Sequence, residues 1–288
     1  MSGEGLVVDL GAMVVRIRSA LSGLAEPLQC VYRHFPFVTD AEAFVDVNAA
    51  LARTAGIRGR LRPSLRFLAD GLDPFGALPT DMDLAQLEWG INWCFATMTN
   101  RHLMLHAGTV EIGSRGLLMI GVPGAGKSTL AAALALRSGR LLSDEFGVVR
   151  LRDRALLPLP KPVALKNKSI DVIRAWSPEG IVGPIYRNTH KGDVAHLAVP
   201  RNAVDARRSP AQPSAIVFPR WEADAATRIE SVGSTEAFSL IAFNSFNFDV
   251  LGPDGFDAVR DLVERCPCVR LRYSSLAEAV PALHRLVA

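Results

Sequence analysis

Cysteine is scarce in this sequence, and neither sign of charge is in large excess. The four cysteines are Cys30, Cys94, Cys266 and Cys268; they are dispersed and form neither a CxxC redox pair nor a spaced zinc motif. We therefore expect four reduced thiols. The 32 Lys and Arg against 29 Asp and Glu leave a net charge of +3, which is too small to indicate nucleic acid as a partner.

Long apolar runs are also missing. No run approaches the roughly 18 residues that span a bilayer, and the first ten residues, MSGEGLVVDL, lack a basic region followed by an apolar one. We expect no membrane partner and a cytoplasmic location. The 49% hydrophobic and 21% charged residues are typical of a folded globular protein, and 288 residues suit one large or two modest domains.

Two patterns divide the chain. Short β-rich runs separated by turns fill residues 6 to about 78, whereas helical spacing follows, with Thr80 to Asp83 as a capping box. We predict two units: an N-terminal α+β domain of unknown role, residues 1–80, and a second domain, residues 81–288. The apolar stripe of the helix is expected to consist of Leu84, Leu87, Ile91, Cys94, Phe95 and Met98.

The second unit contains a glycine-rich motif between a predicted strand and a predicted helix. Two β-runs flank a four-residue turn, Gly113–Gly116, and the second run leads into GVPGAGKST at residues 121–129. A helix then ends near Gly139, and the strand of RLLSDEFGVVRL follows, for which we predict a parallel partner in the strand before the loop. Strand, glycine loop and helix are the arrangement of a phosphate-binding loop.

The loop matches GxxxxGK[ST] in full. Glycines let backbone N–H groups turn towards anionic oxygens, and the N-terminus of the following helix adds partial positive charge. Lys127 would reach the β- and γ-phosphates of ATP, and Ser128 would ligate Mg²⁺. The predicted nucleotide-binding residues are Gly121, Val122, Pro123, Gly124, Ala125, Gly126, Lys127, Ser128 and Thr129.

Acidic residues and a histidine accompany the loop. Asp144 and Glu145 end an apolar run that we expect beside the loop strand, where a second acidic element is found in phosphate-loop proteins; a solvated acidic turn is the alternative. If the hairpin pairs Ile112 with Leu117, His106 falls opposite Pro123, at the loop. A packed core histidine is the alternative for that residue.

Further cations lie downstream. Lys166 and Lys168 stand at a strand end before a helix, and Lys191 lies in a segment, 183–193, that we expect to be mobile until ligand binds. A second cation would stabilise a phosphoryl-transfer transition state, although a solvated surface lysine is the alternative for each. In RGRLRP, residues 58–63, the alternation of Arg58, Arg60 and Arg62 is typical of one face of a strand. That face would either be solvated or bind an acidic partner.

Residues 102–150 resemble the catalytic core of HPr kinase/phosphorylase and of the HPr-kinase-related kinases. The segment that carries this resemblance is LHAGTVEIGSRGLLMIGVPGAGKSTLAAALALRSGRLLSDEFGVV. The resemblance implies an α/β fold with the P-loop kinase core of the HPr kinase C-terminal domain. It also implies that Asp144 accepts the proton of an attacking serine hydroxyl. Glu145 and His106 occupy the positions of the family's second aspartate and strand histidine, and Pro123 replaces a loop serine.

Together these features predict an ATP- and Mg²⁺-dependent serine kinase acting on a small protein or peptide. The catalytic candidates are Asp144, Glu145, His106 and Lys191, and the metal candidates are Ser128 and Glu145. A small-molecule kinase or carboxykinase-like phosphotransferase, and a nucleotide-binding switch without transfer, remain open alternatives. The acceptor, a reverse phosphorylase reaction and a homo-oligomeric state are not fixed by these motifs.

Overall fold

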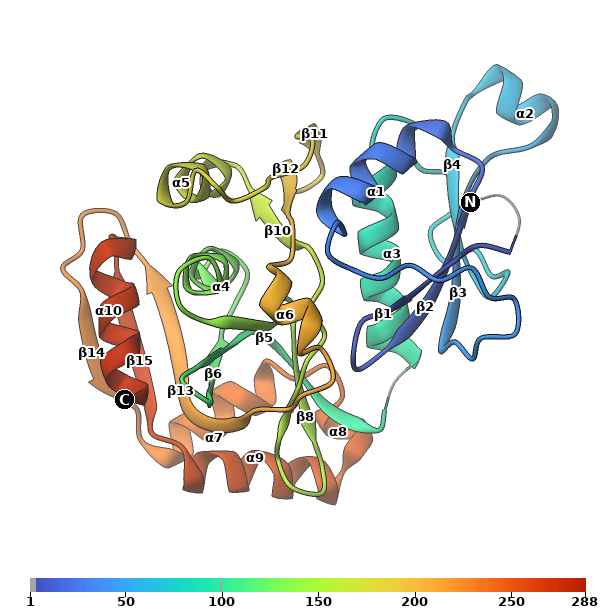
Figure 1. Cartoon of the computed structure of the whole chain (residues 1–288). Helices are drawn as coiled ribbons and strands as arrows, with labels where there is room; N and C mark the ends of the chain where they lie inside the picture. The colour runs from blue at the N-terminus through green and yellow to red at the C-terminus, as the bar shows by residue number, and fades with distance from the viewer. Residues whose placement is uncertain (1–3, 99) are drawn as a thin grey trace.

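The computed structural model describes residues 4–98 and 100–288, apart from the side chains of Arg58 and Met98. The chain is mixed α/β, with a smaller N-terminal unit beside a larger unit built on a mixed sheet (Figure 1). Of the predicted apolar stripe, the described side chains of Leu84, Leu87, Ile91, Cys94 and Phe95 are all buried.

The N-terminal unit is a four-stranded sheet with a long helix packed on β3 and β4. The boundary predicted from the sequence assigns this helix, Asp83–Met98, to the second domain. Alternate side chains of these strands are buried, as expected for a sheet with one covered face. Gly90 of the helix is required by close packing, because a Cβ there would lie 2.2 Å from the ring of Phe67. The elements are β1 (Leu6–Asp9), β2 (Val14–Ser19), η1 (Ser22–Leu24), α1 (Ala25–Val31), β3 (Val47–Arg53), α2 (Gly56–Leu61), β4 (Leu65–Ala69) and α3 (Asp83–Met98).

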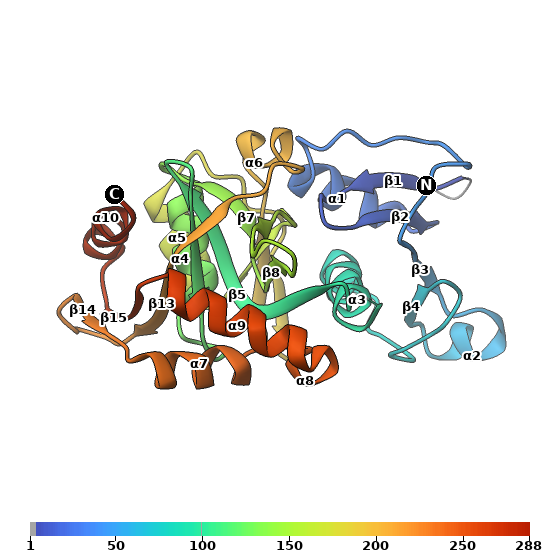
Figure 2. The ribbon, with the colours of Figure 1, turned by 90° about the horizontal axis from the view of Figure 1, so that it is seen from below.

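The larger unit has an eight-stranded sheet in the order β14-β15-β13-β6-β5-β8-β9, with β7 also paired to β5. Helices α4 and α10 pack on one face, while α7, α8 and α9 cover the other (Figures 1 and 2). Its strands are β5 (His102–Ile112), β6 (Arg115–Ile120), β7 (Arg140–Ser143), β8 (Phe146–Arg150), β9 (Leu156–Leu157), β13 (Gln212–Trp221), β14 (Arg228–Ser231) and β15 (Cys268–Tyr273). The helices are α4 (Lys127–Ala135), α7 (Ser234–Phe243), α8 (Phe248–Leu251), α9 (Pro253–Arg265) and α10 (Leu276–Val287).

A separate three-stranded sheet lies between this sheet and the N-terminal unit (Figure 1). It consists of β10 (Val163–Lys166), β11 (Tyr186–Thr189) and β12 (Gly192–Leu197), followed by the short helix α6 (Arg201–Asp205); α5 (Lys168–Trp176) follows β10. Residues 186–197, part of which we expected to be a loop, therefore form a β-hairpin with Lys191 at its tip.

Two sequence expectations about strand pairing are wrong. Only Gly113 and Ser114 join β5 to β6, both with positive φ (52° and 71°), which is typical of a two-residue hairpin turn. Ile112 consequently pairs with Arg115 and not with Leu117. In addition, β7 pairs antiparallel with β5, so β5 separates it from β6, and the parallel neighbour of β6 is β13.

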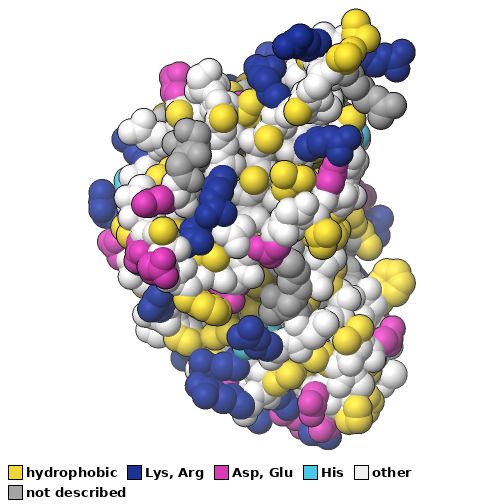
Figure 3. All heavy atoms as spheres, turned by 90° about the vertical axis from the view of Figure 1, so that its right-hand side faces the viewer, with side chains coloured by type: hydrophobic (Ala, Val, Ile, Leu, Met, Phe, Trp, Pro, Cys, Tyr) yellow, Lys and Arg dark blue, Asp and Glu magenta, His cyan; other side chains and the backbone are white. Residues whose placement is uncertain are grey.

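Two local expectations also fail. Helix α3 begins at Asp83, so Thr80 lies too far upstream to cap it. RGRLRP does not form a strand, because α2 spans 56–61; the side chain of Arg58 lies outside the described residues, and Arg60 and Arg62 are exposed. On the face shown in Figure 3, basic side chains are interleaved with acidic and apolar ones.

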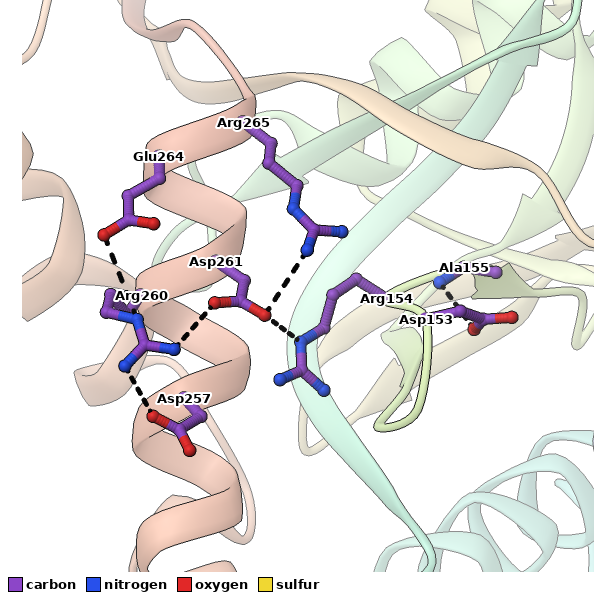
Figure 4. Close-up of polar contacts among 8 residues, drawn as sticks. All are labelled: Asp153, Arg154, Ala155, Asp257, Arg260, Asp261, Glu264 and Arg265. Atoms are coloured by element: carbon purple, nitrogen blue, oxygen red, sulfur yellow. Dashed lines mark hydrogen bonds and ion pairs between the residues drawn. The ribbon is translucent and has the colours of Figure 1, made fainter.

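An ion-pair network fixes α9 to the turn after β8 (Figure 4). Asp261 of α9 contacts Arg154 of that turn at 3.0 Å, and Arg260 and Arg265 of its own helix at 3.0 and 3.7 Å. Burial would raise the pKa of Asp261, but its contacts with Arg260 and Arg154 lower it. The network therefore joins α9, in the layer of helices α7 to α9, to the turn between β8 and β9.

Candidate functional site

The glycine loop links β6 to α4 at the carboxyl end of β6. Gly124 and Gly126 have φ of 87° and 95°, which L side chains rarely adopt. A Cβ on Gly126 would also lie 2.2 Å from the Tyr273 hydroxyl oxygen. The backbone therefore favours glycine at both positions, and the phosphate-loop motif predicts the one at 126.

Lys127 folds back over this loop. Its Nζ donates to the carbonyl oxygens of Gly121 (2.5 Å) and Val122 (3.1 Å), and the residue is only 6% exposed. Burial lowers the pKa of Lys127, while Asp144 and Glu145 act in the opposite direction. The outer part of the loop, residues 122–124, is exposed, so a ligand can approach it.

Asp144 follows β7 and is buried, at 5% exposure. Neither of its carboxylate oxygens has a hydrogen-bond partner of normal geometry among the residues described. Burial and the neighbouring Glu145 raise the pKa of Asp144, whereas the nearby Ser128 hydroxyl, Lys166 and Lys127 lower it. A buried carboxylate that lacks a hydrogen-bond partner and lies near a second carboxylate is a place where a cation or a proton would be bound favourably.

Glu145 points to a different set of partners. One carboxylate oxygen lies 3.5 Å from Nε2 of His106, and the other lies 3.8 Å from Nζ of Lys166. The hydrogen bond with His106 is the main cause that lowers the pKa of Glu145; burial raises it, and Lys166 and Lys191 lower it further. Glu145 also has φ of 74°, an unfavourable conformation for a non-glycine residue that is often found at functional sites.

His106 lies in the site, but through a strand pairing that the sequence did not indicate. The β5–β6 ladder ends at Ala107 and Ile120, so the expected position of His106 opposite Pro123 is wrong. His106 pairs instead with Phe146 of β8, which places its ring beside Glu145.

Lys191 is held near the acidic pair by the N-terminal unit. Its Nζ lies 5.2 Å from the ring centroid of Trp89 in α3, and the ring of His190 packs on the same indole at 4.6 Å. Burial and Lys166 lower the pKa of Lys191, and Glu145 raises it. Sequence reasoning missed Trp89, because it lies outside the buried stripe of α3 and nothing in the sequence links it to residue 191.

The other downstream lysines separate in space. Lys166 ends β10 and contacts Glu145, whereas Lys168 begins α5 and is exposed. Thr129 lies in the first turn of α4 and is half-buried, like Ser128. The loop, the acidic pair, His106, Lys166 and the β11–β12 tip therefore form one candidate site.

The sequence matches no protein-family model and no curated protein with which it was compared.

The residues that the structure describes contain no group of three or more His, Cys, Asp or Glu side chains that could hold a metal ion. No helix of the described chain has the length and apolarity to cross a membrane. The four cysteines, all within the described ranges, are free thiols.

Proposed function

We propose that this chain binds ATP with Mg²⁺ at Gly121–Thr129 and transfers the γ-phosphoryl group to a hydroxyl, in the manner of an HPr-kinase-like serine kinase. The observation that carries the proposal is the buried, unpartnered carboxylate of Asp144 close to Ser128 and Lys127 of the glycine loop. A loop that only turned the chain would not need a charged group buried beside it, since an unpaired buried charge is destabilising.

The residues present fit a magnesium ion. The Ser128 hydroxyl and the ionised Glu145 would hold it, and the unpartnered oxygens of Asp144 adjoin the same place. When bound, the ion would neutralise developing charge on the phosphate oxygens. Two protein ligands, one from the loop and one from the acidic pair, completed by water and phosphate oxygens, are typical of magnesium in kinases.

The pKa values of the acidic pair are pushed apart, which suggests separate roles. The raised pKa of Asp144 suits a proton acceptor, and the lowered pKa of Glu145 suits a group that stays ionised. In the proposed step the acceptor hydroxyl oxygen bonds to the γ-phosphorus, its proton passes to Asp144, and the bond to the β-γ bridging oxygen breaks to release ADP. Lys127, Lys166 and Lys191 would stabilise the charge on the transferred group.

A small protein or peptide serine is the proposed acceptor, and a small hydroxylated molecule is the other enzymatic possibility. Both use the same loop and proton acceptor, so labelled transfer from ATP to serine peptides and to small alcohols separates them. A nucleotide-binding switch would bind ATP and label neither.

The test compares phosphoryl transfer in wild type, Asp144→Asn and Glu145→Gln. Asp144→Asn should lower the transfer rate by roughly 10²- to 10⁴-fold with ATP·Mg²⁺ affinity nearly unchanged, because only the proton acceptor is lost. Glu145→Gln should weaken Mg²⁺-dependent nucleotide binding. Asp153→Asn, on the partly exposed turn after β8, is the matched control and should transfer normally. Full activity of Asp144→Asn contradicts its proposed role.

A further inference from the structure

The larger sheet presents an aromatic side chain to the glycine loop on the side away from the acidic pair. Trp221 ends β13, the parallel neighbour of β6, so it lies at the same carboxyl edge as the loop. Asp144 follows β7, which pairs with β5 on the opposite side of β6. Trp221 and Asp144 therefore flank the loop from opposite sides.

Trp221 is fixed to the loop itself. Its backbone N–H donates to the carbonyl oxygen of Ala125 at 3.2 Å, and its Cβ lies 3.3 Å from where a Cβ on Gly126 would be. Its indole Nε1 donates to the carbonyl oxygen of Ser274 at 3.3 Å. The backbone bond thus fixes the residue beside the loop, and the Nε1 bond orients the indole.

The indole lies on the sheet face that carries α4. Trp221 pairs with Tyr273 of β15, and these two side chains point to the same side. Tyr273 is buried in the core that includes α4, and its hydroxyl donates to the carbonyl oxygen of Gly126 at 3.3 Å. Trp221 nevertheless remains 50% exposed. Exposed aromatic residues are common, but this one is held against a phosphate-binding loop.

We infer that Trp221 is the stacking surface for the purine base of the nucleotide whose phosphates bind the glycine loop. The inference rests on the proposed nucleotide binding. The γ-phosphate must lie towards Asp144 for transfer, so the rest of the nucleotide extends across the loop towards β13 and β15. Ligands of sheets with parallel strands bind at the carboxyl ends of those strands, which is where Trp221 lies. An indole face stacks on any base, so Trp221 contributes affinity without choosing between adenine and guanine.

The experiment compares ATP·Mg²⁺ with Mg²⁺-tripolyphosphate, which has the phosphates but no base. Trp221→Ala should weaken ATP binding roughly 5- to 100-fold in calorimetry, as expected for the loss of one stacking contact. Tripolyphosphate affinity should stay the same. Trp221→Phe should recover part of the ATP affinity. Phe256→Ala on α9 removes an equally exposed ring (50%) and should change neither affinity.

A second measurement covers the case in which Trp221→Ala folds poorly. In wild type, ATP should quench tryptophan emission more than tripolyphosphate does. Trp221→Phe should remove that difference, although three other tryptophans, among them Trp89 beside Lys191, remain. An unchanged ratio of ATP to tripolyphosphate affinity in the folded Trp221 variants overturns the stacking role alone. Failure of wild type to bind either compound overturns nucleotide binding as well.

Discussion

Asp144 is held in an environment that does not favour its charge. It is buried, has no hydrogen-bond donor of normal geometry among the described residues, and lies beside a second carboxylate, Glu145. Such an arrangement stores unfavourable free energy, which a bound cation or proton would relieve.

This environment predicts a pH-dependent effect on stability. Because the pKa of Asp144 is raised in the fold, the charged form destabilises the native state above that pKa, and the penalty disappears as pH falls below the ordinary aspartate pKa of about 4. Asp144→Asn should therefore be more stable than wild type at pH 7 to 8, by on the order of 1–3 kcal/mol without ligand.

Urea unfolding at several pH values checks this prediction. The advantage of Asp144→Asn should shrink steadily between pH 7 and pH 4. A variant that is less stable than wild type at pH 7, with the same difference at pH 4, would show that Asp144 makes a favourable native contact.

At the residue scale the sequence predicted the loop well and its surroundings less well. Gly126 is fixed by the motif, and its φ of 95° leaves almost no other residue possible. Gly124 also has a positive φ, although its position in the motif is variable. The contact between His106 and Glu145 depends on strand register, which a two-residue difference in turn length changes. Neither Trp89 nor Trp221 belongs to a motif, so their places beside Lys191 and the loop follow only from the fold.

At the scale of elements, the longer local patterns were predicted correctly, whereas a helix cap, a short strand and the strand pairings were not. The helical stripe at 84–95 and the strand, loop and helix around residue 121 are as predicted, because each depends on periodicity within one segment. The predicted parallel partner of β6 was wrong, since β5 occupies that position and β13, almost one hundred residues away in sequence, lies on the other side. Such pairings depend on long-range contacts that periodicity does not encode.

At the scale of the whole molecule, a buried polar cluster joins the N-terminal unit to the rest. Glu88 of α3 forms a salt bridge with Lys161 and accepts a 2.6 Å hydrogen bond from the Tyr32 hydroxyl. All three are nearly inaccessible, and burial, together with Glu88, keeps the pKa of Tyr32 well above its usual value. The neighbouring His196 has its pKa lowered to about 4, mainly by burial, so it is neutral at pH 7.

This cluster predicts a strongly destabilising single substitution. Lys161→Met leaves the charge of Glu88 buried and uncompensated, which should lower the free energy of unfolding by about 3–5 kcal/mol. Adding Glu88→Gln removes that charge and should recover much of the loss. Arg187→Met, which breaks the exposed Arg187–Asp193 pair, should change stability by less than about 1 kcal/mol. If urea unfolding gives the single and double variants equal losses, the uncompensated charge is not the cause.

We propose that Gly121–Thr129 binds the phosphates of ATP. The most direct test is calorimetric titration of wild type, Lys127→Ala and Arg174→Ala with ATP·Mg²⁺, with thermal melting to establish that each is folded. Wild type should bind one ATP, and Lys127→Ala should bind it at least about tenfold more weakly, because a charge-assisted contact with phosphate is lost. Arg174→Ala, which removes an exposed positive charge from α5, should bind like wild type. No binding by folded wild type, or equal affinity in folded Lys127→Ala, would contradict the account.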